Sequence, residues 1–188
     1  MITIVSGLPR SGTSLMMQIL ASSGYDILTD GIRTPDENNP NGYYEYEKVK
    51  SLKTDNSWMA EADGKVVKII AQLLPFIPVQ FQYEIYFMER NLDEIISSQS
   101  KMLQRLNKNH IHADNQSLKT VFQKQSDSIK SELAAMENVR TIMVSFNNLV
   151  NCVDSELESL IQFSENRLEK ERILKIIMPE LYRERIQN

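Results

Sequence analysis

Short apolar runs alternate along this chain with segments whose apolar residues recur every three or four positions. The runs predict buried strands, and they cover residues 2–6, 66–70, 84–88 and 140–145. A weaker run at residues 25–28 predicts a fifth strand. Strands that alternate with helices are typical of a parallel sheet with helices on both faces, so we expect a three-layer α/β fold.

The segments between the runs carry helical periodicity. Apolar positions at helical spacing follow the first and third predicted strands, at residues 15–20 and 92–106, and a third set covers residues 118–136. Asn91 stands where it can cap the second of these helices, because its side chain can accept a hydrogen bond from a first-turn N–H. The chain has no glycine after position 64, and its end is expected to be helical. The helices predicted there cover residues 154–163, 166–177 and 179–185.

Length and composition narrow the class of protein. The 188 residues match one domain on the usual scale of about 150 residues, so we expect residues 1–188 to form a single domain. The net charge is -4 and no apolar stretch reaches the roughly 18 residues that span a bilayer, so we expect neither a nucleic-acid nor a membrane partner. Cys152 is the single cysteine, which excludes an internal disulfide. With no targeting segment in its first residues, the chain is predicted to be cytoplasmic.

The clearest motif lies between the first predicted strand and the first predicted helix. It consists of Gly7, Leu8, Pro9, Arg10, Ser11, Gly12, Thr13 and Ser14. Two glycines with four residues between them let the backbone curl so that successive N–H groups point inward, and the helix that follows adds the positive end of its dipole. This strand–loop–helix context is what a phosphate-binding loop (P-loop) requires. We therefore predict an anion site in residues 9–14 and a P-loop NTPase-like sheet with a helical C-terminus.

One position within this loop changes the expected chemistry. Loops that hydrolyse nucleotides carry a lysine after the second glycine, whereas this chain has Thr13 there and places its cation at Arg10. Ser14 keeps the position of a magnesium-binding hydroxyl. Glu89 could replace the usual acidic ligand of magnesium, but Arg90 beside it would oppose a metal cation. The loop therefore favours an anion site without obligatory magnesium.

Two segments resemble the donor-binding motifs of sulfotransferases. Residues 5–15, Val-Ser-Gly-Leu-Pro-Arg-Ser-Gly-Thr-Ser-Leu, resemble the 5′-phosphosulfate loop, especially that of bacterial members with Pro-Arg-Ser-Gly-Thr. Arg90, at the end of the third predicted strand, and Ser98, eight residues later, resemble the motif that holds the 3′-phosphate. A forked guanidinium and a hydroxyl suit that anion.

Two further segments are similar to the same family, and some positions depart from it. Residues 39–45, Asn-Pro-Asn-Gly-Tyr-Tyr-Glu, resemble the Asn-Pro-x-Gly-Tyr-x-Glu loop of bacterial members. Residues 143–149 resemble a degenerate form of the strand followed by Tyr-Glu-Asp-Leu. Ile70 stands where the animal cytosolic enzymes have a catalytic histidine, and Leu92 replaces the proline after Arg-Asn. A tail without glycine cannot form the family's C-terminal Arg- and Gly-rich clamp.

The resemblance implies a transferase that uses 3′-phosphoadenosine 5′-phosphosulfate (PAPS). The sulfuryl group would pass by in-line displacement to a hydroxyl or amine of a small-molecule or glycan acceptor, leaving 3′,5′-adenosine bisphosphate (PAP), with no metal required. Arg10 would stabilise the developing charge, Lys68 would reach the bridging oxygen and Glu45 would act as the general base. The donor-binding residues would be Pro9, Arg10, Ser11, Gly12, Thr13, Ser14, Arg90 and Ser98.

Two other functions stay open at this point. One is a small P-loop kinase that uses ATP and magnesium, with Glu89 as the acidic ligand. The other is a non-catalytic nucleotide-binding module. His110 and His112, with no third ligand nearby, lead us to predict no metal site. The sequence identifies neither the acceptor nor the oligomeric state.

Overall fold

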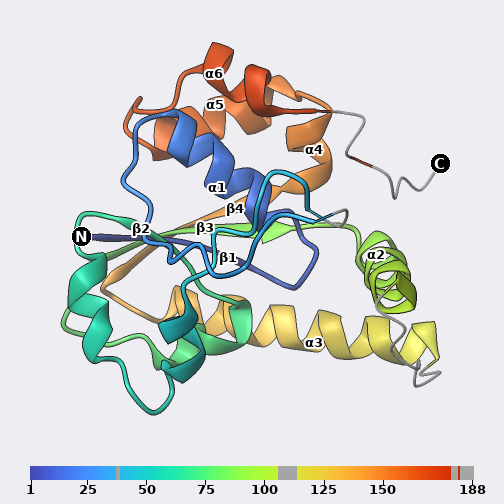
Figure 1. Ribbon diagram of the computed structural model, residues 1–188, viewed down its shortest axis with the longest axis horizontal. Coiled ribbons are helices and arrows are strands. Elements are labelled where there is room, and N and C mark those ends of the chain that lie inside the picture. Colours follow the sequence, from blue (N-terminus) through green and yellow to red (C-terminus); the bar gives the residue numbers. More distant parts are fainter. Residues whose placement is uncertain (37–38, 106–113, 179–181, 183–188) are drawn as a thin grey trace.

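A four-stranded parallel sheet forms the centre of the molecule (Figure 1). The computed structural model describes residues 1–36, 39–105, 114–178 and 182. The strands in this part of the chain are β1 (Ile2–Gly7), β2 (Val66–Lys68), β3 (Tyr83–Glu89) and β4 (Val139–Ser145). All neighbouring strands are parallel, and their order across the sheet is β2-β1-β3-β4. The prediction of an α/β fold with a parallel sheet and flanking helices is confirmed.

The central strand is apolar because both faces of the sheet are covered. Every residue of β1 is buried, with Val5 in the core on one face and Ile2 and Ile4 in the core on the other. Strands buried on both faces have largely apolar sequences, which is why the hydrophobic pattern located β1.

One face of the sheet is covered by helices from both ends of the chain (Figure 1). They are α1 (Thr13–Ser22), α4 (Phe146–Val150), α5 (Asp154–Phe163) and α6 (Lys170–Ile176). Met16 and Leu20 of α1 pack in a core with Tyr86 of β3 and Leu157 of α5. The loop between β1 and α1 is therefore held at both ends by buried elements.

The other face is covered by a long helix and three short 3₁₀ helices. They are α3 (Asn115–Ala134), η1 (Glu47–Ser51), η2 (Ser57–Ala62) and η3 (Ala71–Phe76). Trp58, Ile85 and Leu133 belong to the core beneath them. Helix α2 (Leu92–Arg105) packs against α3 beyond the end of the sheet (Figure 1). Asn91 caps α2 as predicted, because its Oδ1 accepts a hydrogen bond of 2.9 Å from the Asp93 N–H.

Two strand predictions were wrong: one strand is shorter than predicted, and the other does not form. β2 ends at Lys68 instead of residue 70, because the chain turns there into η3. Residues 25–28 contribute one isolated bridge, between Ile27 and Val66, and no strand. Short apolar runs therefore located buried segments, but they did not show how many residues of each segment pair with a neighbouring strand.

One helix prediction was wrong at its start. Helix α6 begins at Lys170 rather than at residue 166, because Glu165 and Asn166 have φ angles of 53° and 64°. Such left-handed conformations do not continue a right-handed helix. Apart from Tyr182, the helix predicted at residues 179–185 lies outside the described residues, and so do both histidines. Among the described helices, none has the length and apolar character needed to cross a bilayer.

Candidate functional site

A cleft of about 400 Å³ lies at the carboxyl edge of the sheet. Parallel pairing brings the ends of β1, β2 and β3 together there, because Val5 pairs with Lys68 and Gly7 pairs with Met88. Crevices at this edge are the usual ligand sites of open parallel sheets. Ser11 is fully buried, whereas the other predicted site residues line the cleft. Those lining residues are Pro9, Arg10, Gly12, Thr13, Ser14, Glu45, Lys68, Arg90 and Ser98.

Left-handed backbone at three positions shapes the predicted phosphate loop. Gly7, Arg10 and Gly12 have φ angles of 149°, 70° and 101°. A Cβ on Gly7 would lie 2.6 Å from the carbonyl oxygen of Met88 in β3, and a Cβ on Gly12 would overlap the ring of Phe146. Both glycines are thus required by close neighbours as well as by backbone conformation.

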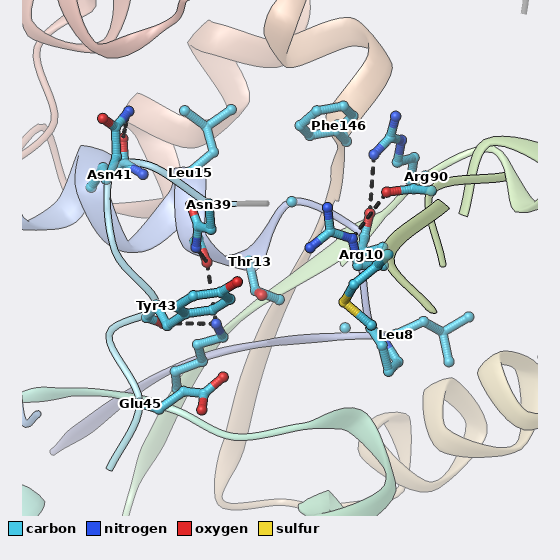
Figure 2. Close-up of a pocket in the computed structure, with 18 of the residues that line it drawn as sticks. Leu8, Arg10, Thr13, Leu15, Asn39, Asn41, Tyr43, Glu45, Arg90 and Phe146 are labelled. Atoms are coloured by element: carbon cyan, nitrogen blue, oxygen red, sulfur yellow. Dashed lines mark hydrogen bonds between the residues drawn. The ribbon is translucent and has the colours of Figure 1, made fainter. Parts of the chain in front are cut away.

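Arg10 connects the two predicted phosphate motifs. Its Nε donates a hydrogen bond of 2.9 Å to Ser98 Oγ. Arg90 Nη1 donates a hydrogen bond of 3.1 Å to the carbonyl oxygen of Arg10 (Figure 2). Burial lowers the pKa of Arg10 from its ordinary value, and the nearby charges of Arg90 and Arg33 lower it further. A bound anion would relieve that repulsion, so the arrangement suits a negatively charged ligand.

Arg90 is held in place by a buried network. Its Nε donates to Glu94 Oε2 at 2.9 Å, and Glu94 is 2% exposed. Glu94 Oε1 also accepts hydrogen bonds from the Tyr182 hydroxyl, at 2.6 Å, and from Asn147 Nδ2, at 3.1 Å. The Arg90 guanidinium lies 4.5 Å from the centre of the Phe146 ring. The sequence contains one signal for this pair, because the spacing of four residues between Arg90 and Glu94 is that of a helical ion pair.

Lys68 and Ser14 meet on the other side of the loop. Lys68 Nζ donates to Ser14 Oγ at 3.2 Å and to the carbonyl oxygen of Tyr43 at 2.8 Å. Asn39 Nδ2 donates to the same Ser14 oxygen at 2.8 Å. Because Ser14 accepts two hydrogen bonds, its proton can be donated to a ligand. Burial lowers the pKa of Lys68 to about 8, against the attraction of Glu45.

Glu45 reaches the cleft as part of an ion pair. Its Oε1 accepts a hydrogen bond of 2.7 Å from Arg33 Nη1, and its side chain is 35% exposed. The Arg33 guanidinium lies 3.4 Å from the centre of the Tyr43 ring, and the Tyr43 hydroxyl donates to Asp36 Oδ1 at 2.7 Å. Tyr43 and Glu45 belong to the predicted loop at residues 39–45, whereas Arg33 carried no motif that singled it out.

The acidic residue assigned to magnesium in the kinase alternative, Glu89, is not part of the described lining of the cleft. It forms an ion pair with Lys130 of α3. The described part of the chain also holds no group of three or more His, Cys, Asp or Glu side chains placed to bind a metal. This arrangement does not favour the kinase alternative.

Comparison with known proteins identifies the fold. No family model matches the chain, and no curated protein matches it in sequence. Among solved structures it is similar to the sulfotransferase domain from the Synechococcus PCC 7002 olefin synthase, with a TM-score of 0.56 and 14% identity over 97% of this chain and 78% of that one. It is also similar to the sulfotransferase domain from the curacin biosynthetic pathway, with a TM-score of 0.54 and 15% identity over 94% of this chain and 77% of that one. At such identities the likeness is one of architecture: the chain has the fold of these sulfotransferase domains.

Proposed function

We propose that this protein is a sulfotransferase that moves a sulfuryl group from PAPS to a hydroxyl or amine of a small-molecule or glycan acceptor. The observation that carries this proposal is the junction of Arg10, Ser98 and Arg90. Two segments that separately resemble the 5′-phosphosulfate and 3′-phosphate motifs meet there through direct hydrogen bonds. The fold shared with sulfotransferase domains supports the same function.

The charge of the cleft suits a donor with several negative groups. Its described lining contains six cationic side chains and one carboxylate, that of Glu45, in a chain whose net charge is -4. The cations are Arg10, Arg33, Lys68, Arg90, Lys101 and Arg105. A concave site lined by one sign of charge concentrates ligands of the opposite sign.

The proposed transfer divides the work between the two sides of the loop. The acceptor oxygen or nitrogen attacks sulfur in line and loses its proton to Glu45, while the bond from sulfur to the bridging oxygen breaks. Protonated Lys68 stabilises the charge that develops on that oxygen, and Arg10 and the loop N–H groups stabilise the sulfuryl and phosphate oxygens. The hydrogen bond between Lys68 and Ser14 places this lysine beside the loop before any ligand arrives.

Calorimetric titration with PAP and with ADP, each with and without magnesium, tests the donor site. We expect PAP to bind more tightly than ADP and without magnesium. At about 100 times its dissociation constant PAP should stabilise the protein by about 2.7 kcal/mol, which a melting curve detects. The non-catalytic module would bind PAP equally well, so turnover of PAPS with candidate acceptors must follow. A preference for ADP with magnesium would contradict the proposal and favour a kinase.

The affinity for PAP should fall as pH rises through the range set by Lys68. Because burial lowers the pKa of Lys68 to about 8, its positive charge is present below that pH and is lost above it. A bound anion raises the pKa of Lys68, so the loss of its charge in the complex occurs at a higher pH. Titrations between pH 7 and 10 should therefore show the affinity for PAP falling by about tenfold, which is the effect expected for one charged hydrogen bond. Lys68→Arg should flatten the profile, since a guanidinium stays protonated. An identical fall in both proteins would show that Lys68 does not contact the ligand.

A further inference from the structure

Asn39 belongs to a tight turn beside the phosphate loop. Its backbone carbonyl accepts a hydrogen bond of 3.1 Å from the Gly42 N–H, and its side-chain Nδ2 donates one of 2.5 Å to the Gly42 carbonyl. The Asn39 N–H donates to the carbonyl oxygen and to Oδ1 of Asp36, each at 3.0 Å. These contacts on both sides of the residue hold the Asn39 side chain in one position.

The orientation of the Asn39 amide follows from its partners. A carbonyl oxygen can only accept a hydrogen bond, so Nδ2 rather than Oδ1 must face the Gly42 carbonyl. The same nitrogen directs its second hydrogen to Ser14 Oγ, at 2.8 Å. An amide nitrogen carries two hydrogens, and both are used here. The amide therefore donates to Ser14 and does not compete for the hydroxyl proton of Ser14.

Ser14 accepts a second hydrogen bond from Lys68, whose Nζ lies 3.2 Å from Oγ. A hydroxyl offers two acceptor positions and one proton. Because Asn39 and Lys68 fill both acceptor positions, the proton is directed to a third partner. Ser14 lines the cleft in the first turn of α1, where the helix dipole favours an anion. The oxygen of a bound phosphate would accept this proton.

The same contacts join the phosphate loop to the segment that carries Glu45. Lys68 Nζ donates to the Tyr43 carbonyl at 2.8 Å as well as to Ser14. Figure 2 shows Asn39, Tyr43 and Glu45 on the same side of the loop. The segment at residues 39–45 is therefore attached to the start of α1 directly through Asn39 and indirectly through Lys68.

We propose that Asn39 is a positioning residue, which directs the hydroxyl proton of Ser14 to the 5′-phosphate end of the bound donor. This inference rests on the proposed sulfotransferase function and adds to it a residue outside the two predicted donor motifs. Asn39 acts through Ser14, and Ser14 contacts the donor. An aspartate at position 39 would have nearly the same shape, but it would accept the hydroxyl proton and place a negative charge beside the phosphate.

A double-mutant cycle on PAP binding, measured by calorimetry, tests this role. Asn39→Ala and Ser14→Ala should each weaken PAP binding by about tenfold, which is the effect of one charged hydrogen bond. The double variant should also bind about tenfold more weakly than the wild-type protein, because Asn39 acts through Ser14. Independent contributions would multiply to about 100-fold. Asn39→Asp should weaken binding more than Asn39→Ala does.

Asn138→Ala is the matched control. Asn138 lies outside the cleft, and its Nδ2 also donates to backbone carbonyl oxygens, those of Val79 and Phe81. This variant should lower the melting temperature and leave PAP binding unchanged. Melting curves of the Asn39 and Ser14 variants would show that each remains folded at the temperature of the titration.

The outcomes separate the role of Asn39 from the wider proposal. Effects of Asn39→Ala and Ser14→Ala that multiply in the double variant would overturn the positioning role and leave the sulfotransferase proposal standing. Binding by Asn39→Asp that is as tight as binding by Asn39→Ala would do the same. A wild-type protein that does not bind PAP would overturn both proposals.

Discussion

Arg90→Ala is expected to lower the free energy of unfolding by about 3–5 kcal/mol, because it leaves a buried carboxylate without its cation. Arg90 and Glu94 form an ion pair of 2.9 Å whose side chains are 8% and 3% exposed. The substitution also removes the hydrogen bond from Arg90 to the Arg10 carbonyl and the guanidinium packed over Phe146. Urea unfolding at pH 7 would measure the loss, and PAP binding should weaken in the same variant.

Matched variants separate the buried charge from the lost side chain. Arg90→Ala/Glu94→Gln should be more stable than Arg90→Ala, because the unpaired charge is gone. Arg172→Ala removes an ion pair whose arginine is 49% exposed, and it should cost less than about 1 kcal/mol. An equal loss for Arg90→Ala and Arg172→Ala would show that Glu94 is not a buried, charge-paired acid.

The hydrophobic pattern predicted the elements of this fold better than their ends. The apolar runs located all four main strands, although only β1 is buried at every residue and the edge strand β4 is buried at Val144 alone. The end of β2 at Lys68 and the start of α6 at Lys170 depend on turns that the pattern does not contain. At α6 the decisive feature is left-handed backbone at Glu165 and Asn166, two residues that no glycine or proline marks.

The residues of the candidate site could be predicted where they belong to a short sequence motif. The loop between Gly7 and Ser14, and the spacing from Arg90 to Ser98, are short motifs, and their residues meet in one cleft apart from buried Ser11. Arg33 and Tyr182 were missed because long-range contacts alone bring them to the site. No pattern within one segment could show that Tyr182 donates to a carboxylate 88 residues earlier.

Gly7→Ala should destabilise the protein by about 4 kcal/mol, from backbone strain together with overpacking. Gly7 has a φ angle of 149°, and an added Cβ would lie 2.6 Å from the carbonyl oxygen of Met88. That carbonyl belongs to β3, which is paired on both sides within the sheet and cannot move aside.

Gly24→Ala is the control that separates the effect of the steric contact with Met88 from the effect of backbone strain. Gly24 also has a positive φ angle, of 82°, but an added Cβ there would meet no atom within 4 Å. It should therefore cost roughly 1–2 kcal/mol, the strain of left-handed backbone, and leave PAP binding intact. Denaturant unfolding and calorimetry on both variants give the comparison.

Gly7→Ala should lose PAP binding even where it remains folded, because the loop must move away from β3 to accept a side chain. Equal losses of stability and retained binding in both variants would show that the loop does not depend on its contact with β3.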